Sequence, residues 1–177
     1  LASERHELSI DSQIRLSGAP SPLTPPADGV EDRSVTPDQR IARLASRGVG
    51  VFHRDDARQA GLSTRQIGYR VATGRWEQLR PGVYRIAGLP LSAHATLAAA
   101  VLATRGTASH LSAAALHRLT EHSPVTPEVT ASSSSGHHHR AVRLHRTSDL
   151  SPRDVQRIDG IRCTNGVRTL IDLGARM

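Results

Sequence analysis

Adjacent histidines are the side chains of this sequence whose type and spacing best suit metal binding. His137, His138 and His139 follow a serine-rich run, and His145 comes shortly afterwards. Neighbouring residues in an extended loop point in different directions, so three of them cannot face one ion. No carboxylate or second well-spaced histidine pair accompanies them. We therefore predict a solvated loop, or a non-specific phosphate contact, with no metal and no cofactor.

A second group of histidines lies among helical patterns. His110 and His117 share one face of a predicted helix, and His94 belongs to the helix before it. They could form a polar cluster, and a Ser-His-Asp arrangement could be drawn from Ser112, His110 and Asp149. The sequence holds no G-x-S-x-G nucleophile elbow. We expect structural histidines and no enzymatic activity.

Four aspartates could form a carboxylate site in the last third of the chain: Asp149, Asp154, Asp159 and Asp172. Asp149 and Asp154 flank a Ser-Pro turn, and Asp159 with the following glycine suits a hairpin turn. Asp172 falls within a predicted helix. Turn formation therefore explains the first three without a metal.

The basic side chains also restrict the chemistry. All 23 of them are arginines, so a P-loop lysine, a Schiff-base lysine and an Asp…Glu-x-Lys nuclease centre are excluded within these residues. Cys163 is the only cysteine, which excludes an internal disulfide and a multi-cysteine zinc site.

Charge is spread unevenly along the chain, whose formal net charge is +7. Residues 37–87 hold ten arginines against four acids, whereas residues 1–36 hold three against six. A basic segment of this density suits contacts with phosphates and predicts salt-dependent binding. Nucleic acid is therefore the expected partner.

A short helix followed by a hairpin lies within this basic segment. Ser63 is a good N-cap, Gln66 completes an S-x-x-Q capping box, and Gly74 suits a left-handed helix end. Ile67 and Val71 share the face that must dock, because so short a helix is not stable alone. The opposite face is free to contact a ligand.

Directly after Gly74 the pattern changes to two short strands. Residues 75–80 and 83–86 are rich in strand-forming side chains, and Pro81 and Gly82 between them are typical of a type II turn. Helices predicted at 37–47 and 54–60 precede the recognition helix. The order predicts a winged helix-turn-helix, in which the hairpin is the wing.

Base readout is assigned to one face of the recognition helix. Arg65, Gln66, Tyr69 and Thr73 would face base edges, and Arg54, Arg70, Arg75, Arg80 and Arg85 would contact phosphates or the minor groove. The predicted DNA-binding residues are Ser63, Thr64, Arg65, Gln66, Tyr69, Arg70, Thr73, Arg75, Arg80 and Arg85.

The predicted fold class is α+β, with three segments. Residues 1–35 are rich in Ser, Pro and acids and are expected to be a disordered leader. Residues 36–87 form the winged helix-turn-helix, and residues 88–177 form a small α+β domain with two helices, two short strand-like runs, a strand pair around Asp159-Gly160 and a last helix from about Val167. The most apolar window, 97–103, is too short to span a membrane, so a reducing cytoplasm is expected.

With these motifs in view, the chain resembles the AbiEi-type antitoxin family of type IV toxin–antitoxin regulators. The resemblance lies in GLSTRQIGYRVATGRWEQLRPGVYRIAG, and continues through SHLSAAALHRL, VRLHRTSDLSPRDV and DGIRCTNGVRTLIDL. It covers about residues 37–177.

The resemblance implies a DNA-binding winged helix that represses its own operon, joined to an antitoxin-like domain that antagonises a nucleotidyltransferase-like toxin. Similar proteins continue into a very-short-patch-repair-like endonuclease domain, so we expect the second domain to be truncated at its C-terminus. Two alternatives remain open: the DNA-binding portion of such an endonuclease protein, and a module that binds only protein. The oligomeric state is also left open.

Overall fold

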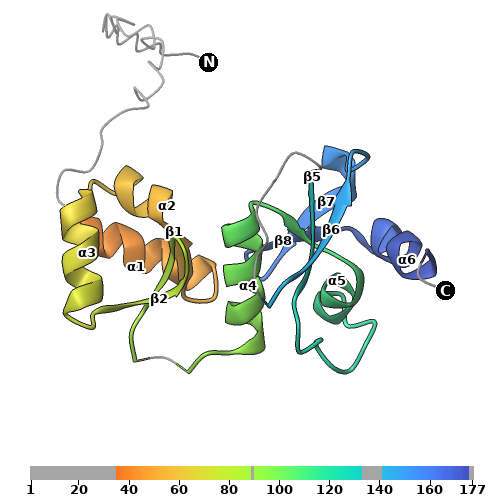
Figure 1. Ribbon diagram of the computed structural model, residues 1–177, viewed down its shortest axis with the longest axis horizontal. Helices are drawn as coiled ribbons and strands as arrows, with labels where there is room; N and C mark the ends of the chain where they lie inside the picture. Colours follow the sequence, from red (N-terminus) through yellow and green to blue (C-terminus); the bar gives the residue numbers. More distant parts are fainter. Residues whose placement is uncertain (1–34, 89, 133–140, 176–177) are drawn as a thin grey trace, which may run out of the picture. The chain divides into compact units, whose positions relative to one another are not determined.

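A computed structural model describes residues 35–88, 90–132 and 141–175. These residues belong to one compact unit, Ser34–Met177. The predicted leader, apart from Val35, and the loop with His137, His138 and His139 lie outside the described residues. The described part contains helices and two separate sheets, which confirms the α+β class (Figure 1).

The first two helices begin at side-chain caps. Helix α1 (Pro37–Arg47) has the predicted capping box of Thr36 and Gln39. Strand β1 (Val51–His53) follows, and α2 spans Arg54–Gln59. The imidazole of His53 caps α2 by accepting from the Asp55 amide, and Asp56 completes its capping box. The sequence analysis missed this cap.

The recognition helix and wing form where they were predicted. Helix α3 spans Thr64–Ala72 and is capped by Ser63 and Gln66, while Gly74 has a φ of +69°. Strands β2 (Trp76–Arg80) and β3 (Val83–Ile86) pair antiparallel around the Pro81-Gly82 turn. With β1 they form a three-stranded sheet of order β1-β3-β2.

One small core holds this winged helix together. Ile41 of α1, Ile67 of α3 and the rings of Phe52, Trp76 and Tyr84 are all buried in it. Phe52 meets Trp76 edge to face, with ring centroids 4.7 Å apart. Three of the few aromatic residues of the chain are therefore concentrated where three helices meet the wing sheet.

The second half contains a five-stranded mixed sheet of order β6-β5-β4-β8-β7. Its strands are β4 (Thr107–Ala108), β5 (Glu128–Ser132), β6 (Arg143–Thr147), β7 (Val155–Ile158) and β8 (Ile161–Thr164). Strands β5 and β6 run parallel, as do β4 and β8. A 3-10 turn (η1, Pro152–Asp154) precedes β7. The two-residue strand β4 was not predicted.

Three helices accompany this sheet: α4 (Ala93–Thr104), α5 (His110–Leu116) and α6 (Gly166–Gly174). Leu97 and Val101 of α4 are buried as predicted, and so are the three alanines between them. A helix with consecutive buried residues is covered on all sides. Among the described residues, none of the helices is long and apolar enough to cross a membrane.

Helix α4 packs between the two sheets (Figure 1). Val51 and Val83 from the small sheet share its core with Val129 and Ile161 from the large one. A second contact comes from the β7–β8 turn, where Gly160 approaches the backbone of Arg47 at the end of α1. The winged helix is therefore buried on one side by the second half of the chain.

Candidate nucleic-acid interface

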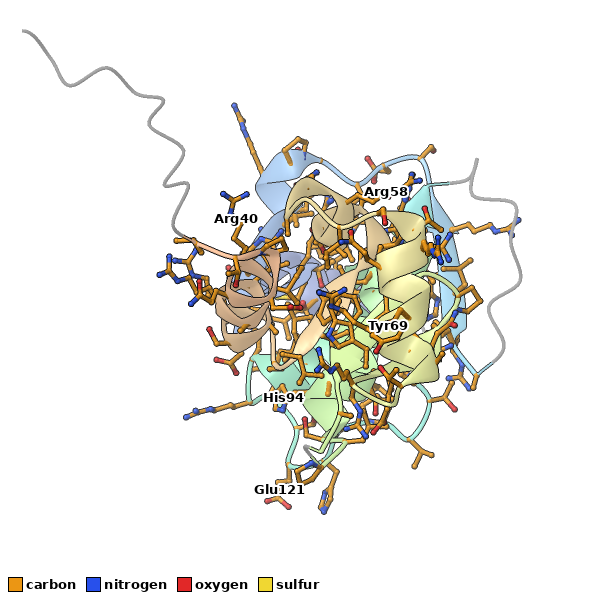
Figure 2. The ribbon with its side chains drawn as sticks, turned by 90° about the vertical axis from the view of Figure 1, so that its left-hand side faces the viewer. Arg40, Arg58, Tyr69, His94 and Glu121 are labelled. Atoms are coloured by element: carbon orange, nitrogen blue, oxygen red, sulfur yellow. The ribbon has the colours of Figure 1, made fainter. Side chains whose placement is uncertain are left out.

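Helix α3 exposes the face that the sequence assigned to DNA. Ile67 on its inner side is 3% exposed, whereas Tyr69 on its outer side is 63% exposed. Thr64, Arg65 and Gln66 are also exposed. In Figure 2, which looks onto this side of the protein, Tyr69 lies on the outer surface of α3 and Arg58 lies near its first turn. The exposed face of α3 therefore carries polar side chains, and its contact with DNA stays a prediction.

Some of the predicted contact residues also hold the helix itself. The Gln66 side chain accepts from the Ser63 amide at 2.8 Å, and Ser63 Oγ accepts from the Gln66 amide at 3.3 Å. The Thr73 hydroxyl donates to the Tyr69 carbonyl at 2.8 Å. Gln66 therefore has only its amide nitrogen to offer a base, whereas the long side chains of Arg65 and Tyr69 are not engaged in capping.

Arg70 lies in an ion pair between helices. Its guanidinium donates to both carboxylate oxygens of Asp38 at 2.8 Å and lies over the Trp76 ring, 5.6 Å from the centroid. The Arg70 side chain is only 13% exposed. Such a bidentate pair fixes α3 against α1 and the wing. Arg70 thus positions the recognition helix, and its predicted phosphate contact stays a prediction.

The other arginines assigned to DNA differ in their surroundings. Arg85 is paired with Glu77 on the neighbouring strand, and its side chain is 14% exposed. Arg80 donates to the Ala141 carbonyl at 3.3 Å, and burial lowers its pKa. Arg54 donates to the Tyr84 hydroxyl at 3.3 Å. Arg75 is exposed after Gly74, so it is the wing arginine best placed for a phosphate.

Arg58 was not predicted from the sequence to contact DNA. Arg58 is exposed in the last turn of α2, and its guanidinium donates to Thr64 Oγ1 at 3.1 Å. That contact places a positive charge beside the first turn of α3, where backbone amides also favour an anion. Its position shortly before the Ser63 cap is the sequence signal that could have identified it.

The Asp38–Arg70 pair predicts a dependence of stability on pH. The Arg70 hydrogen bond holds the pKa of Asp38 below its usual value. Because the unfolded pKa is the higher one, the contribution is complete above about pH 4 and is lost as pH falls through the folded pKa. In urea titrations between about pH 2 and pH 7, Asp38→Asn should flatten the acid-side loss of stability. Glu121→Gln, at an exposed position, should leave the profile unchanged, and an unchanged profile for Asp38→Asn would contradict the assignment.

A substitution at Gly68 is expected to stabilise the protein. It lies within α3, is exposed, and a Cβ added there would meet no atom within 4 Å. We expect Gly68→Ala to raise the free energy of unfolding by about 0.5–1 kcal/mol, because alanine loses less backbone entropy in a helix. Urea denaturation measures the gain. Gly88→Ala, at a φ of +94° and also in open space, should instead destabilise, and equal signs for the two variants would contradict the prediction.

His94, His110 and His117, for which a polar cluster was one option, have different partners. His110 stacks on His145 with ring centroids 3.6 Å apart, and His117 Nε2 lies 2.8 Å from the Thr164 carbonyl oxygen. His94 lies 4.0 Å from Asp159. Ser112 Oγ accepts from the Glu128 amide at 2.8 Å.

Three of the four aspartates meet at one arginine. Arg168 of α6 donates to Asp172 at 2.8 Å and lies 3.7 Å from both Asp149 and Asp154. The Asp172 hydrogen bond is the main reason why the pKa of Arg168 is raised. Turn formation holds for Asp154, which accepts from the Ser151 amide, but the common partner was not predicted.

Three helices, the last of which is the capped recognition helix, and a β-hairpin wing define this part of the chain as a winged helix-turn-helix. Residues 39–87 match the sequence model of the family described as "Transcriptional regulator, AbiEi antitoxin". The AbiEi-type resemblance is thereby confirmed for this segment. A comparison with curated proteins finds no match to the chain.

Proposed function

We propose that this protein is a sequence-specific double-stranded DNA-binding transcriptional regulator, the antitoxin of a type IV toxin–antitoxin system that represses its own operon in the cytoplasm. The observation that carries the DNA-binding part is the outer face of α3. Arg65 and Tyr69 project outward from α3. The capping box, the buried Ile67 and the Asp38–Arg70 ion pair hold this helix in place without using these two side chains.

The charges around this face support binding to a duplex. Arg65 can make a bidentate contact with a guanine, which contributes about 1–3 kcal/mol of discrimination against other bases. Arg58 in the last turn of α2 and Arg75 just before the wing are both exposed, one before α3 in the sequence and one after it. They suit phosphate contacts, which fix orientation without reading sequence.

The antitoxin part of the proposal is supported by the family match. That match covers the winged helix, and the second half extends the resemblance through its sequence motifs. A nucleotidyltransferase-like toxin is the proposed partner of the second half. The full chain should neutralise such a toxin, whereas a variant altered only in its second half should not. This comparison tests the antitoxin part independently of DNA binding.

Selection of duplexes from a random DNA pool tests the DNA-binding part. The full chain should enrich one motif at low and at moderate salt. Arg65→Ala should lose preference at one or two base positions, by roughly 5- to 150-fold in relative affinity. Arg75→Ala should weaken binding to specific and random duplexes alike and reduce the salt dependence.

The control is Arg153→Ala, which removes an exposed arginine from the 3-10 turn η1 of the second half. It lowers the net charge as Arg65→Ala does and should keep the full motif. Equal losses for Arg65→Ala and Arg153→Ala would show that charge alone binds DNA. Recovery of no motif, with binding that disappears as salt rises, would overturn sequence-specific regulation.

A further inference from the structure

Two histidines and a buried glutamate converge in the second sheet. His110 is the first residue of α5, Glu128 the first of β5, and His145 lies in the middle of β6. One ligand atom from each lies within 4.8 Å of the others. We propose that His110, Glu128 and His145 form a binding site for a divalent transition metal ion of the zinc class.

One pair of ligand atoms already has the separation that such an ion requires. His145 Nε2 and Glu128 Oε2 lie 3.2 Å apart. A tetrahedral ion with bonds of about 2.0–2.1 Å holds two ligands about 3.3 Å apart. The third ligand must approach from no more than 4.8 Å, a movement of about 1.5 Å that a side-chain rotation supplies.

The strand register holds the three side chains on one face of the sheet. Glu128 pairs with Arg143, and Thr130 pairs with His145. Glu128 and Thr130 are two residues apart, so their side chains lie on the same face. Since α5 packs on β5, His110 at the start of that helix is brought over the same face.

Neighbouring side chains orient two of the proposed ligands, Glu128 and His110, through hydrogen bonds. Arg143 Nη1 donates to Glu128 Oε1 at 3.1 Å, which directs Oε2 toward His145. Ser109 Oγ lies 3.0 Å from His110 Nδ1 and accepts from the Thr130 hydroxyl at 2.8 Å. Contacts of this kind fix the ring orientation of metal-binding histidines and the carboxylate that binds beside them.

The backbone conformation of His110 and the stacking of His110 on His145 also support a binding site. His110 has a φ of +49°, a left-handed conformation that costs about 1–2 kcal/mol for a residue with a side chain. Strain of this kind is concentrated at functional sites. The His110 and His145 rings are nearly parallel, at 15°, and stack with their centroids 3.6 Å apart, so the two imidazoles lie side by side at the proposed site.

The set of donors selects the metal. Two imidazole nitrogens and one carboxylate oxygen favour a first-row transition metal such as zinc, iron, cobalt or nickel, whereas magnesium and calcium prefer oxygen ligands. Three protein ligands leave a further coordination position for water. Because the ligands come from α5, β5 and β6, the bound ion ties the helix to the edge of the sheet.

Titration of the metal-free full chain with Co²⁺ tests the proposal, because tetrahedral cobalt is followed by its visible absorption. The chain should bind one equivalent, Zn²⁺ should displace it, and Zn²⁺ should raise the melting temperature. His145→Gln should weaken Co²⁺ binding at least about tenfold. Glu128→Gln, a second variant that removes a ligand of a different kind, should do the same.

Two controls separate this site from other histidines. His122→Gln changes an exposed histidine, and a triple variant replaces His137, His138 and His139 with asparagine. Both should bind Co²⁺ like the unaltered chain. Circular dichroism of the metal-free variants establishes that each is folded. Unaltered binding by folded His145→Gln, or loss of binding in the triple variant alone, would overturn the proposal, and so would the absence of binding by the unaltered chain.

Discussion

Gly160→Ala should lower the free energy of unfolding by about 3 kcal/mol, because it adds a steric overlap to a backbone strain. Gly160 has a φ of +77°, and a Cβ at this position would overlap the Arg47 carbonyl oxygen and lie 3.1 Å from the Gly48 Cα. These neighbours are backbone atoms at the end of α1, so no side chain can rotate away. The β7–β8 turn must instead withdraw from α1.

Gly74→Ala is the matched control, since Gly74 has a similar φ of +69° but a Cβ added there would meet no atom within 4 Å. It should cost about 1 kcal/mol, the backbone strain alone. Urea denaturation of both variants measures the difference. Equal losses would mean that Gly160 is not held against α1. They would contradict the close contact between the β7–β8 turn and the winged helix.

Arg168→Met should cost about 3–5 kcal/mol, as removal of one partner from a buried ion pair does. The side chains of Arg168 and Asp172 are 16% and 10% exposed. Asp172 Oδ2 is already buried without a hydrogen-bond partner among the described residues. Without the guanidinium, the Asp172 charge would be left in a poorly solvated position, with Asp149 and Asp154 close to the same place.

A double variant distinguishes this cause from a loss of packing. In Arg168→Met with Asp172→Leu the buried charge is gone, so the double variant should be more stable than Arg168→Met alone. Arg146→Met, at an exposed arginine of β6, should change stability by no more than about 0.5 kcal/mol. A double variant less stable than the single one would show that the side-chain volumes matter more than the charges.

Features set by neighbouring residues could be predicted from the sequence. The capping boxes at Thr36 and Ser63, the helix end at Gly74 and the Pro81-Gly82 turn each depend on a few residues in a row, and each is present. The docking face of α3 followed from periodicity, because Ile67 had to be buried for so short a helix to persist.

Features set by pairing of distant strands could not be predicted. The His110–His145 stack depends on β5 and β6 running parallel, which no local pattern indicates. Arg70 finds Asp38 only once α3 has packed against α1. The convergence of three aspartates on Arg168 likewise follows from the docking of α6 beside the turn before β7. The predicted DNA contacts themselves stay predictions. On the outer face of α3, Arg65 and Tyr69 are the long side chains that take no part in capping the helix.

Helix α4 determines where the chain can be cut without exposing buried residues. The segment that matches the family model is residues 39–87. Val51 and Val83 in that segment are 4% and 0% exposed and lie in one core with the buried residues of α4. A fragment cut at the wing would expose Val51 and Val83 to water, so we expect the unit that unfolds cooperatively to be longer than the matched segment.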